Sequence, residues 1–174
     1  MTHWKAAALA AAGSLALAGC QHGGTDSAAV EKQAKADVRV FIPAFNAGDI
    51  DTLIAMYAPD AEVMAPGNAR AVGHDAIRAV LTKESAAMKA AGVALELNDD
   101  DKAGASGELG YHSGSFVVKD SSGNVVDSGN YLAVLKRQED GKWLLFRDTW
   151  NSDRPPPAPA EAPAADAAAE APAT

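Results

Sequence analysis

The two ends of the sequence confine any globular fold to its middle. Near the N-terminus an apolar run at residues 6–18 follows Lys5 and stops just before Cys20. A positive start and a short apolar run are typical of a secretory signal, and a membrane span needs about 20 apolar residues. Residues 155–174 are mostly alanine and proline, which predicts a disordered tail. One domain of typical size remains, at residues 28–154.

The residues before Cys20 resemble the lipobox of bacterial lipoproteins. Leu17-Ala18-Gly19-Cys20 places a branched apolar residue and two small residues before the cysteine. The resemblance implies a signal peptide at residues 1–19, diacylglycerol on Cys20 and a lipidated linker at residues 20–27. Gln21 stands where an aspartate would resemble an inner-membrane signal. We therefore expect an exported protein, anchored at the periplasmic face of the outer membrane. An ordinary signal peptide with an incidental cysteine is the alternative.

The cysteine count and the charge exclude several classes of function. Cys20 is the only cysteine, so a domain in which it carries lipid has no disulfide, no cysteine metal ligand and no cysteine nucleophile. The chain has 15 basic and 23 acidic residues, for a net charge of −8, and no basic cluster. We therefore expect no nucleic-acid partner.

The sequence predicts neither a metal nor a cofactor. No two histidines have the spacing of zinc ligands. There is no glycine-rich phosphate loop and no Gly-x-Ser-x-Gly elbow. The acidic run at residues 98–101 lacks the glycine and the glutamate of a calcium-binding loop, so we expect a solvated turn there.

Apolar spacing predicts three helices in the first part of the domain. In residues 28–47 apolar side chains recur every three or four positions, at Val30, Ala34, Val38, Phe41 and Phe45. Pro43 lacks a backbone donor, which predicts a kink or an early break. Asp49 and Asp75 are expected to cap the second and third helices. These helices are expected at residues 50–57 and 76–91.

Alternating apolar and polar residues predict a sheet in the rest of the domain. Turn-forming residues at 120–124 and 138–141 separate the last strands. Strands are expected at residues 62–65, 93–97, 108–119, 125–137 and 142–151. This order favours an α+β fold in which helices cover one face of a bent, antiparallel sheet.

Six short motifs together resemble the SnoaL-like domains of the nuclear transport factor 2-like (NTF2-like) superfamily. They are FNAGD at 45–49, YAPDA at 57–61, GHDAI at 73–77, GNY at 129–131, GKW at 141–143 and DTWN at 148–151. The resemblance covers essentially the whole domain. It implies a cone-shaped, strongly bent antiparallel sheet with three helices packed on its concave side. Most of these positions also have a structural explanation, because glycines supply turns and aspartates cap helices.

The resemblance does not extend to the mechanism of ketosteroid isomerase, an enzyme of this fold. That enzyme uses an aspartate base, a tyrosine and a neutral aspartic acid. The shared motifs place these groups at Ala65, at Phe41 and near Ala133. None of the three residues carries the required chemical group, so whether the chain is an enzyme stays open.

The same matching predicts which side chains face the concave side of the sheet. It turns Leu144 inward on the last strand, Ser115 and Ala133 inward on the neighbouring strands, and His112 outward. An aromatic cavity for a small ligand is therefore expected, with a filled core as the alternative. The predicted ligand-binding residues are Phe41, Tyr111, Ser113, Tyr131, Phe146, Asp148 and Trp150.

Asp148 has two interpretations. It could be a general base or a ligand anchor, with a pKa raised by burial. It could instead accept a structural hydrogen bond from Tyr131 or from a side chain of the first helix. The sequence places no histidine beside it, which favours the structural interpretation.

Three functions are consistent with the sequence. The first is a non-catalytic module that binds a small apolar or amphipathic molecule. The second is an enzyme of isomerase or hydrolase type that uses Asp148. The third is a structural or assembly module that forms a homodimer through its sheet face. A dry aromatic pocket favours the first, a wet pocket with a perturbed Asp148 the second, and an apolar outer sheet face the third.

Overall fold

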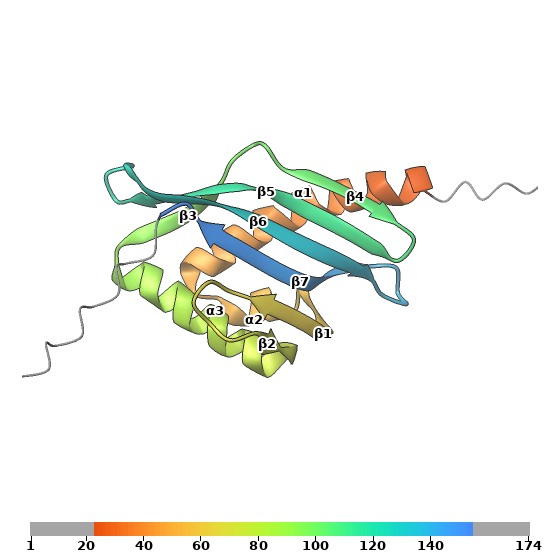
Figure 1. The fold of residues 1–174 in the computed structure, drawn as a ribbon, viewed down its shortest axis with the longest axis horizontal. Helices are drawn as coiled ribbons and strands as arrows, with labels where there is room; N and C mark the ends of the chain where they lie inside the picture. The colour runs from red at the N-terminus through yellow and green to blue at the C-terminus, as the bar shows by residue number, and fades with distance from the viewer. Residues whose placement is uncertain (1–22, 155–174) are drawn as a thin grey trace, which may run out of the picture.

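The computed structural model describes residues 23–154, which form an α+β domain (Figure 1). The helices are α1 (Gly23–Ala47), α2 (Ile50–Ile54) and α3 (Gly73–Ala90). The strands are β1 (Tyr57–Met64), β2 (Ala71–Val72), β3 (Val93–Leu97), β4 (Lys102–Ser106), β5 (Leu109–Asp120), β6 (Val125–Arg137) and β7 (Trp143–Ser152). The predicted signal peptide, Cys20 and the predicted tail lie outside the described residues.

Helix α1 continues through Pro43, so the expected early break does not occur. Proline removes only one backbone hydrogen bond, and it lies within about one turn of the helix end. The helix stops at Ala47, and Gly48 then adopts a φ of 79°, a conformation that glycine reaches without strain.

One of the two expected helix caps is present. Asp49 caps α2, because its side chain accepts a hydrogen bond from the Thr52 backbone N–H at 3.2 Å. Asp75 does not cap α3. That helix begins at Gly73 after Val72, without a side-chain cap, and Asp75 lies in its first turn.

The sheet is mixed, whereas the sequence predicted an antiparallel one. Its strand order is β2-β1-β7-β6-β5-β3, with β4 also paired to β5. Strand β1 pairs in parallel with β7, with Val63 opposite Asp148. Strand β1 starts at Tyr57, inside the region predicted as the second helix, because the segment after α2 pairs with β7.

Strand β4 was not predicted. Its sequence, KAGAS, consists mainly of small residues with weak strand propensity. It forms because it pairs along the first half of β5, while β3 pairs along the second half. Ser27 of α1 also exchanges hydrogen bonds with the backbone of Ala105, at 3.0 and 3.1 Å. The acidic run at residues 98–101 thus connects two strands of the sheet.

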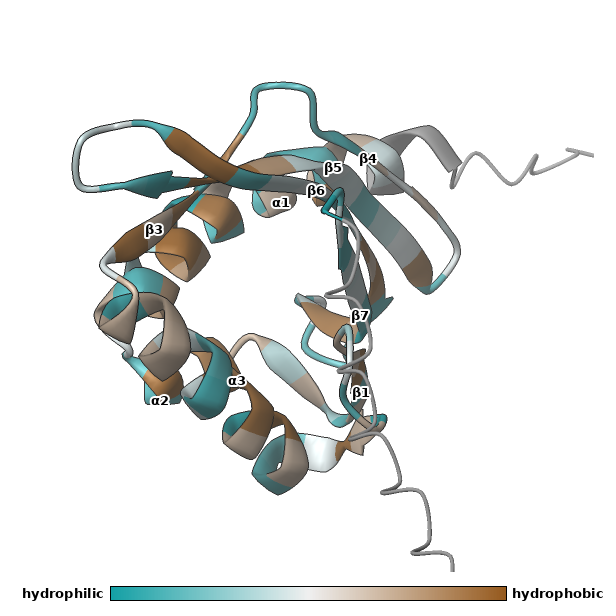
Figure 2. Ribbon diagram, turned by 60° about the vertical axis from the view of Figure 1, so that its left-hand side comes forward, coloured by the Kyte–Doolittle hydropathy of each residue, from teal (hydrophilic) through white to brown (hydrophobic). Residues whose placement is uncertain are grey.

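The sheet curls, and the three helices lie on its concave side (Figure 2), as the fold prediction stated. The larger core cluster joins the helices to β1; it includes Phe45, Leu53, Tyr57, Val63, Ile77 and Leu81. A smaller cluster of Val30, Leu135 and Trp143 joins α1 to β6 and β7. Between these clusters the concave face of the sheet stays partly uncovered.

Gly129 of β6 leaves no room for a side chain. A Cβ atom added there would overlap the carbonyl oxygen of Asn151 and lie 2.5 Å from Phe116 Cζ. Gly129→Ala should therefore lower the free energy of unfolding, measured in urea, by about 1–3 kcal/mol, the usual range for overpacking. Gly104→Ala is the matched control. The three atoms nearest to its new methyl all belong to the side chain of the half-exposed Tyr111, which can move, so its effect should be smaller. Equal effects would contradict this account.

Candidate functional site

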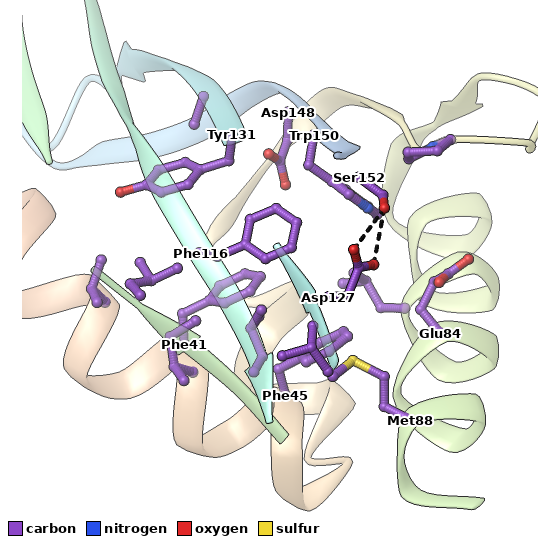
Figure 3. Close-up of a pocket in the computed structure, with 18 of the residues that line it drawn as sticks. Phe41, Phe45, Glu84, Met88, Phe116, Asp127, Tyr131, Asp148, Trp150 and Ser152 are labelled. Carbon is purple, nitrogen blue, oxygen red and sulfur yellow. Dashed lines mark hydrogen bonds between the residues drawn. The ribbon is translucent and has the colours of Figure 1, made fainter. Parts of the chain in front are cut away.

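A cavity of about 790 Å³ lies between the concave face of the sheet and helices α1 and α3. Its size falls in the range of small-molecule sites. The wall is mostly apolar, and Figure 3 shows the aromatic rings that line it, from Phe41, Phe45, Phe116, Tyr131 and Trp150. Of the two predicted alternatives, a cavity and a filled core, the structure therefore shows the cavity.

The register of the strands decides which side chains reach this cavity. Residues directly opposite one another on adjacent strands point to the same face of the sheet. His112 of β5 lies opposite Ala133 of β6, and Ala133 lies opposite Asp148 of β7. The three residues thus form one row across the concave face, and all three line the cavity. Tyr131 and Trp150 form a neighbouring pair in the same wall.

Four of the seven predicted ligand-binding residues lie in the cavity wall, namely Phe41, Tyr131, Asp148 and Trp150. Their binding role stays a prediction. Tyr111 and Ser113 lie instead on the outer face, where Ser113 is opposite Leu132 and both Tyr111 and Leu132 are half exposed. The inward face assigned to β5 is therefore wrong by one residue. Ser115 was also expected to face inward and is not in the cavity wall. His112 and Phe116 of the same strand face the cavity instead.

Phe146 lies outside the cavity wall because β7 contains a bulge. Leu145 and Arg147 pair with consecutive residues of β6, so Phe146 is an extra residue between them. The bulge shifts the alternation, and Leu145 and Asp148 face the cavity, whereas Leu144 and Phe146 do not. The Arg147 guanidinium carbon lies 3.7 Å from the centroid of the Phe146 ring. The predicted inward position of Phe146 is therefore wrong.

Asp148 is a buried carboxyl whose hydrogen-bond partner is Tyr57. The Tyr57 hydroxyl donates to Asp148 Oδ2 over 2.6 Å, and 9% of the Asp148 surface is exposed. Burial raises the pKa of Asp148 to about 6, although the bonds from Tyr57 and from the Thr149 backbone oppose this rise. The expected partners, Tyr131 and α1, are not the ones observed. The sequence did not indicate Tyr57 as the partner of Asp148, because residues 50–57 were expected to form a helix.

His112 is a second buried titratable group in the cavity wall, although the sequence predicted that it points away from the cavity. Its Nε2 atom lies 3.3 Å from Asp101 Oδ2 and 3.1 Å from the Tyr131 hydroxyl. Burial lowers the pKa of His112, and the Asp101 carboxylate opposes that fall. The alternation of Gly110, His112, Gly114 and Phe116 is the sequence signal for this face, because glycines suit a concave, crowded surface.

The remaining polar groups of the wall are mostly acidic. Asp37 of α1 is half-buried, which raises its pKa, while a hydrogen bond from Gln33 at 3.4 Å lowers it. Asp127 accepts hydrogen bonds from the Ser152 hydroxyl at 2.8 and 3.0 Å, drawn in Figure 3. Within residues 23–154 the structure contains no group of three or more side chains that could hold a metal ion.

The three positions carried over from ketosteroid isomerase give this cavity no catalytic group. Phe41 and Ala133 line the wall, and Ala65 is buried beside it, next to the lining residue Pro66. Any chemistry here must therefore come from other side chains.

Comparison with known proteins identifies the family and the fold. Residues 38–146 match the family model of the SnoaL-like domain. No protein of curated function matches the chain. An NTF2-like protein with a cystatin-like fold from Novosphingobium aromaticivorans has a TM-score of 0.61 and 21% identity, covering 71% of this chain and 81% of that chain.

Two further solved structures are similar. A ketosteroid isomerase-like protein from Erwinia carotovora atroseptica has a TM-score of 0.55 and 23% identity, covering 76% of this chain and 99% of that chain. An NTF2-like protein of unknown function from Pseudomonas putida has a TM-score of 0.62 and 20% identity, covering 71% of this chain and 87% of that chain. At these identities the likeness shows the fold alone, and the cone-shaped α+β fold is confirmed.

Asp148 should make stability depend on pH. Its pKa is raised from 3.8 to about 6 in the folded protein, so the folded state binds this proton more tightly than the unfolded chain. The resulting stabilisation is complete below a pH of about 4 and is lost as the pH rises through about 6. A difference of about two pKa units corresponds to roughly 3 kcal/mol.

Urea unfolding of the wild type and of Asp148→Asn between pH of about 4 and 7 tests this prediction. The amide does not ionise and can still accept the Tyr57 hydrogen bond. The wild type should therefore lose stability relative to the variant as the pH rises. If the difference in the free energy of unfolding between the wild type and the variant stayed constant with pH, this would contradict a carboxyl buried in its protonated form.

Proposed function

The chain belongs to the SnoaL-like domain family, and from that premise we propose that its domain binds one small apolar or amphipathic molecule in the cavity. The observation that carries the proposal is the cavity itself, which is large enough for a small molecule and is walled by aromatic and aliphatic side chains. Such walls favour an apolar ligand, because binding removes apolar surface from water on both sides.

The polar groups in the wall support an amphipathic ligand rather than a pure hydrocarbon. His112 and Asp148 lie at one part of the wall, opposite Ala133, while Asp127 and Ser152 lie near the ends of their strands. A few placed polar groups in an apolar cavity orient a ligand that has its own polar group.

The location that we propose rests on the sequence alone. Cys20 would carry a diacylglycerol anchor, so the binding domain would lie at the periplasmic face of the outer membrane. Among residues 23–154 no helix is long and apolar enough to cross a membrane.

An assembly role is a second candidate, favoured by one observation on the outer face of the sheet. Several apolar side chains there are half exposed, namely Met64, Leu109, Tyr111 and Leu132. A second copy of the chain that packed on this face would cover them and form a homodimer.

Trp150→Ala should weaken ligand binding strongly. The indole ring is part of the cavity wall, and its removal takes away one of the largest apolar contacts available to a ligand. With Nile red as a neutral, apolar probe, the dissociation constant should rise about tenfold or more, equivalent to at least about 1.4 kcal/mol. Fluorescence titration measures this change.

Tyr111→Ala is the control for that experiment, because it removes an aromatic ring from the outer face and should leave Nile red binding unchanged. Native mass spectrometry of the protein from its own host complements the titration. A co-purifying small molecule that the Trp150→Ala variant loses would support the binding function. Retention of the molecule by the variant would remove Trp150 from the site. The same spectra report whether the chain is a monomer or a dimer.

Cys20→Ser should release the protein from membranes. Serine has no thiol to carry lipid, so the variant should not incorporate a labelled fatty acid and should move to the soluble fraction. Gln21→Ala, which keeps the thiol, should remain in the membrane fraction. Membrane association of Cys20→Ser that resists salt would contradict a lipid anchor.

A further inference from the structure

The last described residues lie in the wall of the cavity. Trp150, Ser152 and Arg154 alternate along the chain and all three line the cavity, where Figure 3 shows Trp150 and Ser152 close to Asp127. The Arg154 Nε atom lies 3.9 Å from Asp127 Oδ1, and Asp127 is itself a residue of the wall. The segment that follows Arg154 therefore starts at the cavity.

The backbone leaves the direction of β7 at the same point. Strand β7 ends at Ser152, and the Ser152 hydroxyl accepts a hydrogen bond from the Arg154 backbone N–H at 3.0 Å. A serine hydroxyl that bonds an N–H two residues later forms a turn. The Asp153 N–H donates to the Ser128 carbonyl oxygen at 2.8 Å, which holds this turn against β6. The next residues thus start beside the cavity and do not continue the strand.

The sequence that follows Arg154 suits an apolar, aromatic cavity. Residues 155–160 read PPPAPA and carry no charge, and the first charged residue after them is Glu161. Proline-rich segments bind to grooves lined by aromatic rings, because their extended form loses little conformational entropy on binding. The cavity offers such rings, from Phe41, Phe45, Phe116, Tyr131 and Trp150.

Charge determines how far this segment can enter. The charged side chains of the wall are mostly acidic, and they include Asp37, Glu84 and Asp127. A neutral segment meets no repulsion there, whereas the carboxylate of Glu161 would lie among like charges and lose its water. The uncharged stretch between Arg154 and Glu161 is thus the part that the cavity accepts.

The length of the uncharged stretch matches the cavity. From Arg154 back to Asp148 the chain lines the wall over roughly 20 Å, at about 3.3 Å per residue. Residues 155–160 span roughly 19 Å in the polyproline conformation, at about 3.1 Å per residue. Asp148 lies opposite Ala133 of β6. A segment that turned back at Arg154 would therefore reach as far as Ala133.

We infer that residues 155–160 fold back into the cavity and compete with its ligand. The competition rests on the proposed binding function, whereas the docking does not. A tethered segment has an effective concentration of about 1 mM. If its own dissociation constant is about 0.1 mM, the cavity is free roughly a tenth of the time, and the apparent dissociation constant of a ligand rises about tenfold. The segment would thus keep out weakly bound apolar compounds and yield to a tightly bound ligand.

Two acidic residues in the segment should expel it from the cavity. In the full chain, Ala158→Asp together with Ala160→Asp places two carboxylates where the acidic wall repels them. The dissociation constant of Nile red should therefore fall about tenfold in a fluorescence titration. The matched control is Ala168→Asp together with Ala169→Asp, which adds the same charges beyond Glu161 and should leave the constant unchanged. All four substitutions lie outside residues 23–154, so the domain itself is the same in all three proteins.

Nuclear magnetic resonance without any ligand tests the docking itself. The backbone signal of Ala133 and the indole signal of Trp150 should shift in the first double variant and stay in place in the control. The indole signal of Trp143, which packs in the smaller core cluster outside the cavity wall, is the internal reference. Shifts that grow with protein concentration would place the segment of a second copy in the cavity and overturn the inference.

The two assays separate this inference from the proposed function. If all three proteins bound Nile red equally and the signals of Ala133 and Trp150 did not move, the inference would fail and the binding function would stand. If both signals shifted but no protein bound Nile red, the binding function would fail and the docking would stand. Shifted signals with an unchanged dissociation constant would overturn the competition alone.

Discussion

The buried hydrogen bond between Tyr57 and Asp148 holds together the two parts of this domain. Tyr57 begins β1, directly after the two N-terminal helices, and Asp148 lies on β7, which pairs with β1 in parallel. A buried carboxyl without a partner would be strongly destabilising, so each residue requires the other. Their bond joins β1, the strand that follows α1 and α2 in the chain, to β7. Helix α1 itself is held to β7 near its middle by the Gln33 amide, which donates to the Trp143 carbonyl oxygen at 2.9 Å.

Small residues on the concave face of the sheet leave room for the cavity. Ala133 lies at the centre of the row that contains His112 and Asp148. The absence of a side chain at Gly129 leaves room for the Phe116 ring, whose Cζ atom would lie 2.5 Å from a Cβ placed there. Larger side chains at these positions would fill the space that the aromatic rings enclose. The same burial that excludes water raises the pKa of Asp148 and lowers that of His112. The packing thus determines both the shape of the site and the protonation of its groups.

Sequence patterns located most of the secondary structure but not the strand faces. The periodic apolar residues of α1 and α3 and the long alternating strands β5, β6 and β7 were expected close to where they lie. The inward face of β5 was misassigned by one residue, which exchanged His112 for Tyr111 and Ser113. A single-residue error of this kind reverses a strand, because successive side chains point to opposite faces. At Phe146 the cause was a bulge, which depends on how β7 fits against β6 and leaves no local signal. Strand β4 forms only because β5 and α1 are beside it.

The sequence by itself determined the α+β class of the domain and its family, because these depend on apolar periodicity and on short turn and cap motifs within single segments. It also determined that the three groups of ketosteroid isomerase are missing. Only the tertiary structure decided that β1 joins the sheet in parallel, that Tyr57 is the partner of Asp148 and that His112 faces the same cavity. These features depend on which residues become neighbours across strands. A pairing between residues 91 positions apart in the chain, such as Tyr57 with Asp148, has no local physical signature.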